Sequence, residues 1–106
     1  MAKAKSEAPG ARSRARDLIV QSLYQKEITG HDVVELLRQF HDRPEYARVE
    51  KSYYDDALKA ICENMATIEK RIDALADRPV AQLDPVEKAI LLLGFYEMES
   101  KPDVPF

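Results

Sequence analysis

The sequence predicts an all-α protein, and three observations lead to that prediction. Apolar residues recur at spacings of three and four along most of the 106-residue chain, which is the period of a helix with one buried face. The chain lacks tracts rich in Val, Ile and Thr with the alternating pattern of half-buried β-strands. Helix start and stop signals separate the periodic segments. A chain of this length is expected to form one domain with its own core.

The first two predicted helices lie in the N-terminal third of the chain. The first spans residues 12–29 and stops at Thr29-Gly30, because glycine accepts the left-handed conformation that ends many helices. The second is shorter, with Asp32 as its N-terminal cap. The residues expected to face the core from these helices are Ala15, Leu18, Ile19, Leu23, Ile28, Val33, Leu36, Leu37 and Phe40.

A third helical stretch begins near Glu50, after a loop around Pro44. Its apolar residues keep the helical spacing throughout, so one long helix or two helices broken near residues 64–67 would both fit. A second loop is expected at residues 77–82. The apolar stripe of this stretch consists of Tyr54, Ala57, Leu58, Ile61, Met65, Ile68, Ile72 and Leu75.

The clearest boundary precedes the last helix. Asp84 can cap this helix, Pro85 suits its first position, and Glu87 completes a capping box. The helix is apolar almost all round, as expected of a helix covered on every side, yet the chain ends eight residues beyond Met98. We therefore expect an uncovered side that binds a protein partner or a second copy of the chain. The residues expected in that interface are Leu91, Leu92, Phe95, Tyr96 and Met98.

Positive charge is concentrated at the N-terminal end. Residues 1–16 carry five basic side chains and one acidic side chain, whereas the other 90 residues carry 11 basic and 18 acidic ones. Such asymmetry in an acidic protein indicates that this end binds a polyanion. Residues 1–11 are expected to form a disordered basic arm.

Three arginines lead into the first helix. On a helix, Arg12 and Arg16 share one face and Arg14 points nearly opposite, whereas in an extended segment all three face the same way. Either geometry can neutralise phosphates of a single strand. Tyr24, one helical turn after Gln21, is expected either to stack on a base or to pack against the edge of the core. The predicted RNA-binding residues are Lys3, Lys5, Arg12, Arg14, Arg16, Gln21 and Tyr24.

Catalytic and metal-binding patterns are not found in the sequence. His31 and His41 lie ten residues apart, without the spacing that places two histidines on one helical face, so no metal site is predicted. Cys62 has no histidine partner and is predicted to be a structural thiol. The scattered glycines form no phosphate-binding loop, so neither an enzyme nor a bound cofactor is predicted. A single cysteine and the lack of a long apolar segment predict a cytoplasmic protein without membrane contact.

Two landmarks of the chain together resemble the NusB family of bacterial transcription antitermination factors. The first is Arg14-Ala15-Arg16-Asp17 with Gln21-Ser22-Leu23-Tyr24. The second is Asp84-Pro85-Val86-Glu87-Lys88-Ala89-Ile90-Leu91 with Tyr96-Glu97, followed by Asp103-Val104-Pro105-Phe106. The order and separation of these motifs extend the resemblance over nearly the whole chain.

The resemblance implies a helical domain at residues 12–106 with two subdomains, at residues 12–66 and 67–106. It also implies binding of boxA-type single-stranded RNA together with the ribosomal small-subunit protein NusE. In the family, this complex helps RNA polymerase read through terminators, chiefly in ribosomal RNA operons. Two departures stand out: the family usually continues with two more helices that add to the RNA surface, and Leu92 stands where an arginine is often found. We therefore expect an incomplete second subdomain and reduced sequence discrimination.

Two alternatives remain open from the sequence. The chain could be a helical protein-interaction or dimerisation module without specific RNA binding, in which case the basic segment is incidental. It could also be a fragment of an enzyme, because a similar helical domain is attached to certain RNA methyltransferases. The second alternative requires a catalytic domain, and these 106 residues supply no cofactor site for one.

Overall fold

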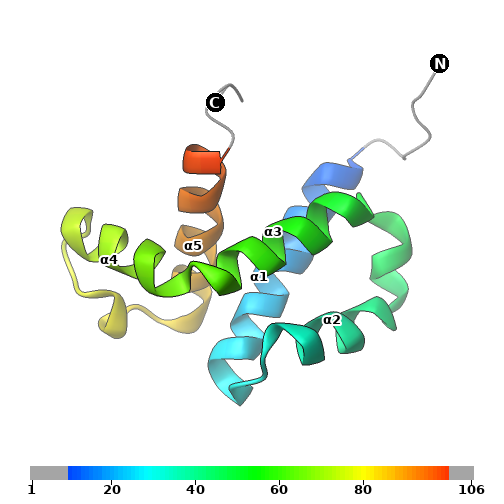
Figure 1. The fold of residues 1–106 in the computed structure, drawn as a ribbon, viewed down its shortest axis with the longest axis horizontal. Helices are drawn as coiled ribbons and strands as arrows, with labels where there is room; N and C mark the ends of the chain where they lie inside the picture. Colours follow the sequence, from blue (N-terminus) through cyan, green and yellow to red (C-terminus); the bar gives the residue numbers. More distant parts are fainter. Residues whose placement is uncertain (1–9, 101–106) are drawn as a thin grey trace.

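In the computed structural model of the protein, residues 10–100 are described, and they form five α-helices and two short 3₁₀ helices (Figure 1). The described residues contain no β-strand, so the prediction of an all-α fold is confirmed. The elements in order are α1 (Ala11–Thr29), α2 (Val33–His41), η1 (Pro44–Arg48), α3 (Lys51–Glu63), α4 (Met65–Leu75), η2 (Val80–Gln82) and α5 (Pro85–Ser100).

Helix α1 is the centre of the arrangement. It packs against α3 and α5 and also contacts α2 and η1, while α4 continues from α3 and packs against α5 (Figure 1). One continuous hydrophobic core contains buried residues from all five α-helices, because each helix turns an apolar stripe inward. The most deeply buried large side chains are Tyr54, Phe40, Leu18, Ile19, Leu36, Leu58, Ile61, Ile72 and Ser22.

The predicted helix ends are confirmed by their hydrogen bonds. Gly30 ends α1 with a φ of 77°, and its N–H donates to the Lys26 carbonyl over 2.8 Å. The Asp32 carboxylate accepts from the backbone N–H of Glu35 at 3.0 Å and so caps α2. Before α5, Asp84 accepts from the Glu87 N–H at 2.9 Å, and the Glu87 carboxylate accepts from the Asp84 N–H at 3.3 Å. This reciprocal pair is the capping box predicted from the sequence.

The third helical stretch is two helices rather than one. Asn64 lies between α3 and α4, and its backbone N–H and side-chain amide both donate to the carbonyl of Ala60. These bonds satisfy the end of α3, so the chain turns there and α4 can pack against α5. The break falls in the predicted range.

Three details differ from the sequence prediction. Ala11, assigned to the disordered arm, is the first residue of α1 and is buried. Ile28 and Leu75, both expected in the core, are 59% and 76% exposed. Ile28 is exposed because it shares the outer side of α1 with Gln21 at about 100° of rotation per residue, and Leu75 is the last residue of α4. Within residues 10–100, no helix is both long and apolar enough to span a membrane.

Candidate nucleic-acid interface

The three N-terminal arginines lie on different sides of α1. The helix begins at Ala11, so Arg12, Arg14 and Arg16 are all helical and the extended alternative is excluded. At about 100° per residue, Arg12 and Arg16 project toward one side while Arg14 projects toward another. Lys3 and Lys5, the other predicted basic contacts, lie outside the described residues.

Arg12 is bound to the start of α3. Its Nε lies 2.6 Å from Glu50 Oε1 and its Nη2 lies 3.0 Å from Glu50 Oε2, which is a two-point pairing. The guanidinium also lies 4.0 Å from the centroid of the Tyr53 ring. The hydrogen bond to Glu50 raises the pKa of Arg12 despite partial burial of the group. Arg12 therefore connects α1 to α3.

Arg16 is bound to α5. Its Nε donates to Glu97 Oε2 over 2.8 Å, and the same carboxylate oxygen accepts a hydrogen bond from the Tyr53 hydroxyl. Burial and the Glu97 carboxylate raise the pKa of Tyr53, so this hydroxyl stays protonated and donates. Arg12 and Arg16 thus belong to one network, built around Tyr53, that joins α1, α3 and α5. Their contribution to RNA binding stays a prediction.

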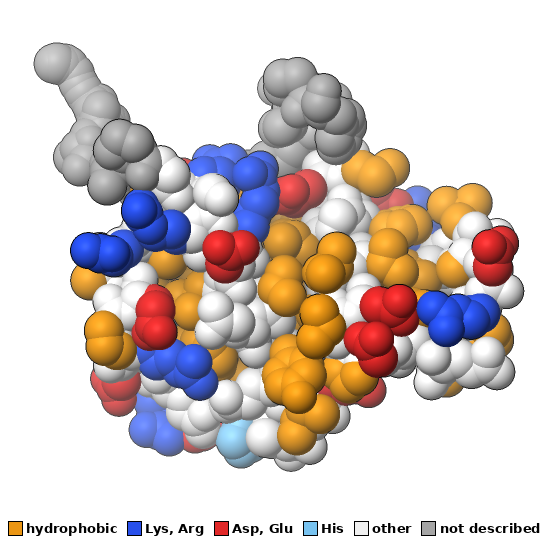
Figure 2. Space-filling view, turned by 180° about the vertical axis from the view of Figure 1, so that it is seen from behind, with side chains coloured by type: hydrophobic (Ala, Val, Ile, Leu, Met, Phe, Trp, Pro, Cys, Tyr) orange, Lys and Arg blue, Asp and Glu red, His pale blue; other side chains and the backbone are white. Residues whose placement is uncertain are grey.

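Arg14, Gln21 and Tyr24 are exposed along one stripe on the outer side of α1, which we call the outer stripe. Tyr24 is 43% exposed, so its ring is partly available to a ligand. Figure 2 shows the side of the molecule that lies behind α3 in Figure 1. A band of hydrophobic side chains crosses this side, and Lys and Arg gather mainly to its left. Apolar and cationic groups therefore lie next to each other on this face.

Two hollows flank the outer stripe, and Gln21 lines both. The larger has a volume of ≈ 620 Å³ and is mostly apolar; the smaller has a volume of ≈ 200 Å³ and carries charged groups. The larger hollow is lined by Val20, Gln21, Tyr24, Gln25, Ile28, Thr29, Phe40, Arg43 and Val86. The smaller is lined by Arg14, Asp17, Leu18, Gln21, Glu45, Arg48 and Val49.

Arg43 and Arg48 were not among the candidates predicted from the sequence. Arg43 directly precedes η1 and Arg48 is its last residue, in the connection between α2 and α3, and each lines one of the two hollows. The Arg43 guanidinium lies 4.0 Å from the Phe40 ring centroid, and its Nη2 donates to Gln25 Oε1 over 3.4 Å. The only signal in the sequence was a pair of arginines around Pro44, which is not specific.

The residues predicted for an interface on α5 differ in exposure. Leu92 is 2% exposed, so its assignment to a partner surface is wrong: α1 and α4 pack against that side of α5. Leu91, Phe95 and Tyr96 are partly buried against the core, whereas Met98 is 54% exposed. Two residues not predicted for the surface, Val86 and Ile90, are also about half exposed. Ile90 lies on the opposite side of the helix from the buried Leu92, at about 100° of rotation per residue, and Val86 lies in the first turn.

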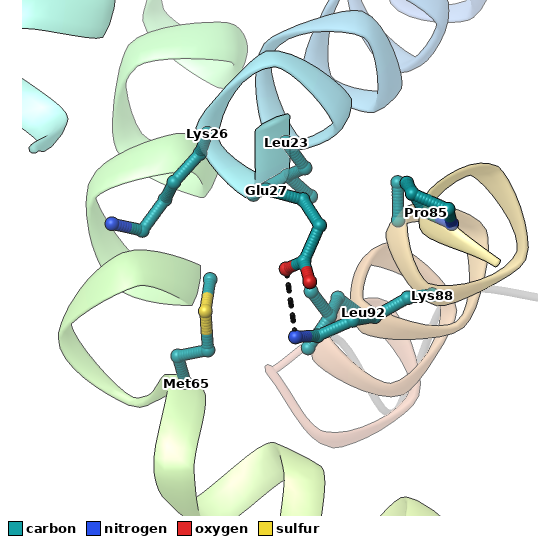
Figure 3. Close-up of a pocket in the computed structure, with 8 residues that line it drawn as sticks. Leu23, Lys26, Glu27, Met65, Pro85, Lys88 and Leu92 are labelled. Carbon is teal, nitrogen blue, oxygen red and sulfur yellow. Dashed lines mark hydrogen bonds and ion pairs between the residues drawn. The ribbon is translucent and has the colours of Figure 1, made fainter. Parts of the chain in front are cut away.

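Lys88 on α5 joins three helices. Its ammonium lies 2.9 Å from Glu27 Oε1 on α1 (Figure 3), and 3.0 Å from Glu69 Oε2 on α4. Burial lowers the pKa of Lys88, but the hydrogen bonds to the two carboxylates outweigh it and the net shift is upward. The side chain is only 16% exposed, so the charge is held in place against α1, α4 and α5.

Replacing Lys88 with methionine is expected to lower the free energy of unfolding by about 1–2 kcal/mol, because two carboxylates lose their shared cation while the apolar stem is kept. Urea denaturation measures this change, with Lys70→Met, an exposed lysine of α4, as the charge-matched control. The difference between the variants should shrink in acid that protonates carboxyl groups. Equal stability of the two variants at neutral pH would contradict the role of Lys88.

The two histidines and the cysteine lie on different elements or connections. His41 Nε2 lies 2.9 Å from Asp55 Oδ1, and its ring stacks on Tyr46 with centroids 4.3 Å apart. His31 lies in the connection between α1 and α2. Cys62 is partly buried, and burial raises the pKa of its thiol. In the described part of the chain, no group of His, Cys, Asp and Glu is arranged to hold a metal ion.

A comparison with known protein families identifies the family of this chain. Residues 13–106 match the model of the NusB family. The chain belongs to the NusB family. The named relatives are transcription antitermination proteins rather than enzymes, so the non-enzymatic prediction is confirmed.

Named relatives of the NusB family align along most of this chain. It is 36% identical to transcription antitermination protein NusB of Alcanivorax borkumensis over 98 residues, covering 92% of the chain and 65% of the relative. It is 37% identical to the protein of the same name from Halorhodospira halophila over 95 residues, covering 90% and 61%. For the Ralstonia nicotianae protein, the identity is 35% over 105 residues, covering 99% and 68%. The chain therefore spans less than two thirds of the first two relatives.

Proposed function

We propose that this chain is a bacterial transcription antitermination factor that binds boxA-type single-stranded RNA in the cytoplasm. In this proposal it acts with the ribosomal protein NusE and RNA polymerase on ribosomal RNA operons. The observation that carries the proposal is the exposure of Arg14, Gln21 and Tyr24 along one stripe of α1. Membership in a family whose named relatives are antitermination proteins supports it.

The outer stripe offers the groups that a single strand requires. A guanidinium at Arg14 can bind a backbone phosphate, and the partly exposed Tyr24 ring can stack on a base. The Gln21 amide lies between them along α1 and can donate to or accept from a base edge. In this proposal, one helix offers a group for a phosphate, a group for a base edge and a ring for stacking.

Arg12 and Arg16 have a different main role in this proposal. Their ion pairs with Glu50 and Glu97 hold α1 against α3 and α5, and so fix the direction of the outer stripe. Both side chains keep 39% exposure, which leaves room for a weaker contact with RNA. Lys3 and Lys5 are proposed to add further phosphate contacts.

We assign the protein partner to the apolar residues of α5 that remain accessible. Met98 is 54% exposed, and Leu91, Phe95 and Tyr96 are only partly buried. An accessible apolar surface of this kind favours association with another protein. The proposed occupant is NusE; a second copy of the chain, which would make this a dimerisation module, is the alternative.

Replacing Tyr24 with alanine is expected to weaken binding of a boxA-type RNA about tenfold, because a stacked base contributes roughly 1–3 kcal/mol. Replacing Arg14 with alanine should reduce the slope of log K against log salt by about 0.7, the value for one phosphate contact. Fluorescence anisotropy at several salt concentrations measures both effects.

Lys70→Ala removes one charge from α4 and is the control for a nonspecific electrostatic effect. If the unmodified chain forms a stable dimer by light scattering and does not bind the RNA, the dimerisation module is correct and the proposed function is not. If both variants match the control, the outer stripe is not the RNA site.

A further inference from the structure

We propose that the connection between α2 and α3 forms a second wall of the RNA site, in which Arg48 binds a backbone phosphate together with Arg14. This inference rests on the proposed RNA-binding function and adds a contact from outside α1. Arg48 lines the ≈ 200 Å³ hollow with Arg14, although 34 positions separate them in the sequence. The fold therefore brings two guanidinium groups to one hollow.

The position of Arg48 is fixed by its neighbours. It is the last residue of η1, and the next side chain, Val49, is 4% exposed in the core. The backbone N–H of Glu50 donates to the carbonyl of Ala11 over 3.1 Å, which attaches this connection to the start of α1. An anchored backbone on both sides of the hollow reduces the entropy lost when a ligand orders the side chains.

The Arg48 guanidinium has no ionic partner within the described residues. Its side chain is exposed and forms no ion pair or hydrogen bond with any of residues 10–100. Five of the seven other arginines in this range form ion pairs with a glutamate: Arg12, Arg16, Arg38, Arg71 and Arg78. An exposed guanidinium that lines a hollow next to the outer stripe is therefore available to a phosphate.

The same hollow contains two carboxylates, from Asp17 on α1 and Glu45 on η1. Two positive and two negative groups give little attraction for a free phosphate ion. A ribose–phosphate unit suits the hollow better, because its phosphate can accept from the arginines and its 2′-hydroxyl can donate to a carboxylate. The chemistry of the hollow therefore favours RNA over DNA.

The connection between α2 and α3 also lines the larger hollow. Arg43, at the other end of η1, lines the ≈ 620 Å³ hollow with Tyr24 and is held over the Phe40 ring. Gln21 lines both hollows, so a strand can pass from a base stacked on Tyr24 to a phosphate between Arg14 and Arg48. The site that follows is a channel between α1 and η1, with cationic groups on both walls.

The Arg48→Ala variant of the chain tests the second wall. We expect about a fivefold loss in affinity for a boxA-type RNA and a decrease of about 0.7 in the salt slope, because one charge-assisted phosphate contact is removed. Arg48→Lys should recover part of the affinity, since a single positive charge remains. Lys70→Ala is the control with the same change in net charge.

A DNA strand of the same sequence tests the two carboxylates. The unmodified chain should bind RNA more tightly than this DNA, and the ratio of the two affinities should fall when Asp17 and Glu45 are both replaced by alanine. The ratio is informative because the gain in positive charge affects both strands alike. An unchanged ratio would overturn the role of the carboxylates.

The outcomes separate this inference from the function on which it rests. If Arg14→Ala and Tyr24→Ala weaken RNA binding but Arg48→Ala matches Lys70→Ala, the second wall is refuted and the proposed function stands. If the unmodified chain does not bind RNA, the proposed function fails first. Circular dichroism of Arg48→Ala verifies that a loss of affinity does not come from unfolding.

Discussion

Replacing Tyr54 with alanine is expected to lower the free energy of unfolding by about 3–5 kcal/mol, the usual cost of removing a large buried aromatic side chain. Tyr54 on α3 is fully buried, and its ring meets the Tyr46 ring edge-on with centroids 5.6 Å apart. Its hydroxyl lies 2.7 Å from the Ser22 hydroxyl of α1, and burial raises the pKa of Tyr54 to about 12. Urea denaturation followed by circular dichroism measures the loss.

Tyr54→Phe isolates the hydrogen bond. The single proton of the Ser22 hydroxyl goes to the Leu18 carbonyl, 2.8 Å away, so the Tyr54 hydroxyl donates to Ser22. Removing that donor should lower the free energy of unfolding by only about 1 kcal/mol, which keeps the variant folded even if Tyr54→Ala is not. Tyr24→Ala is the matched control, because it removes an aromatic ring that is 43% exposed. A Tyr54→Ala variant as stable as Tyr24→Ala would contradict the packing described here.

The helix ends could be predicted because their chemistry is local. The caps at Asp32 and Asp84 and the stop at Gly30 depend on residues within one turn of the chain. The period of the apolar residues likewise reveals which side of a helix is buried. It could not decide between one and two helices after Glu50, because the helical spacing continues across the break at Asn64.

The partners of charged side chains could not be predicted because they are distant in the sequence. Arg12 and Glu50 are 38 residues apart, and Arg16 and Glu97 are 81 apart. A basic run at a chain end looks the same whether its arginines bind RNA or the rest of the protein. The burial of Leu92 has the same cause, since it depends on how α1 and α4 pack against α5.

The double replacement of Arg12 and Arg16 by alanine is expected to lower the free energy of unfolding by about 2 kcal/mol. This magnitude allows for solvent screening, since each side chain is 39% exposed. The loss comes from the two-point pairing with Glu50, from the contact with the Tyr53 ring, and from the Glu97 carboxylate that loses one of its two partners. Because both arginines act on Tyr53 and Glu97, the two single effects should not add, and a double-mutant cycle measures their coupling.

The double replacement of Arg14 and Arg48 removes the same charge and is the matched comparison. Both of these side chains are exposed, so the free energy of unfolding should fall less than it does for the Arg12 and Arg16 variant, while affinity for boxA-type RNA should fall. The Arg12 and Arg16 variant should thus mainly lose stability, whereas the Arg14 and Arg48 variant should mainly lose RNA affinity. Both are measured at a temperature at which both variants are folded. If Arg12 and Arg16 also contact RNA, their replacement will reduce the salt slope as much as that of Arg14 and Arg48. Equal salt slopes for the two double variants would then show that the number of positive charges, rather than their position on the molecule, determines the affinity.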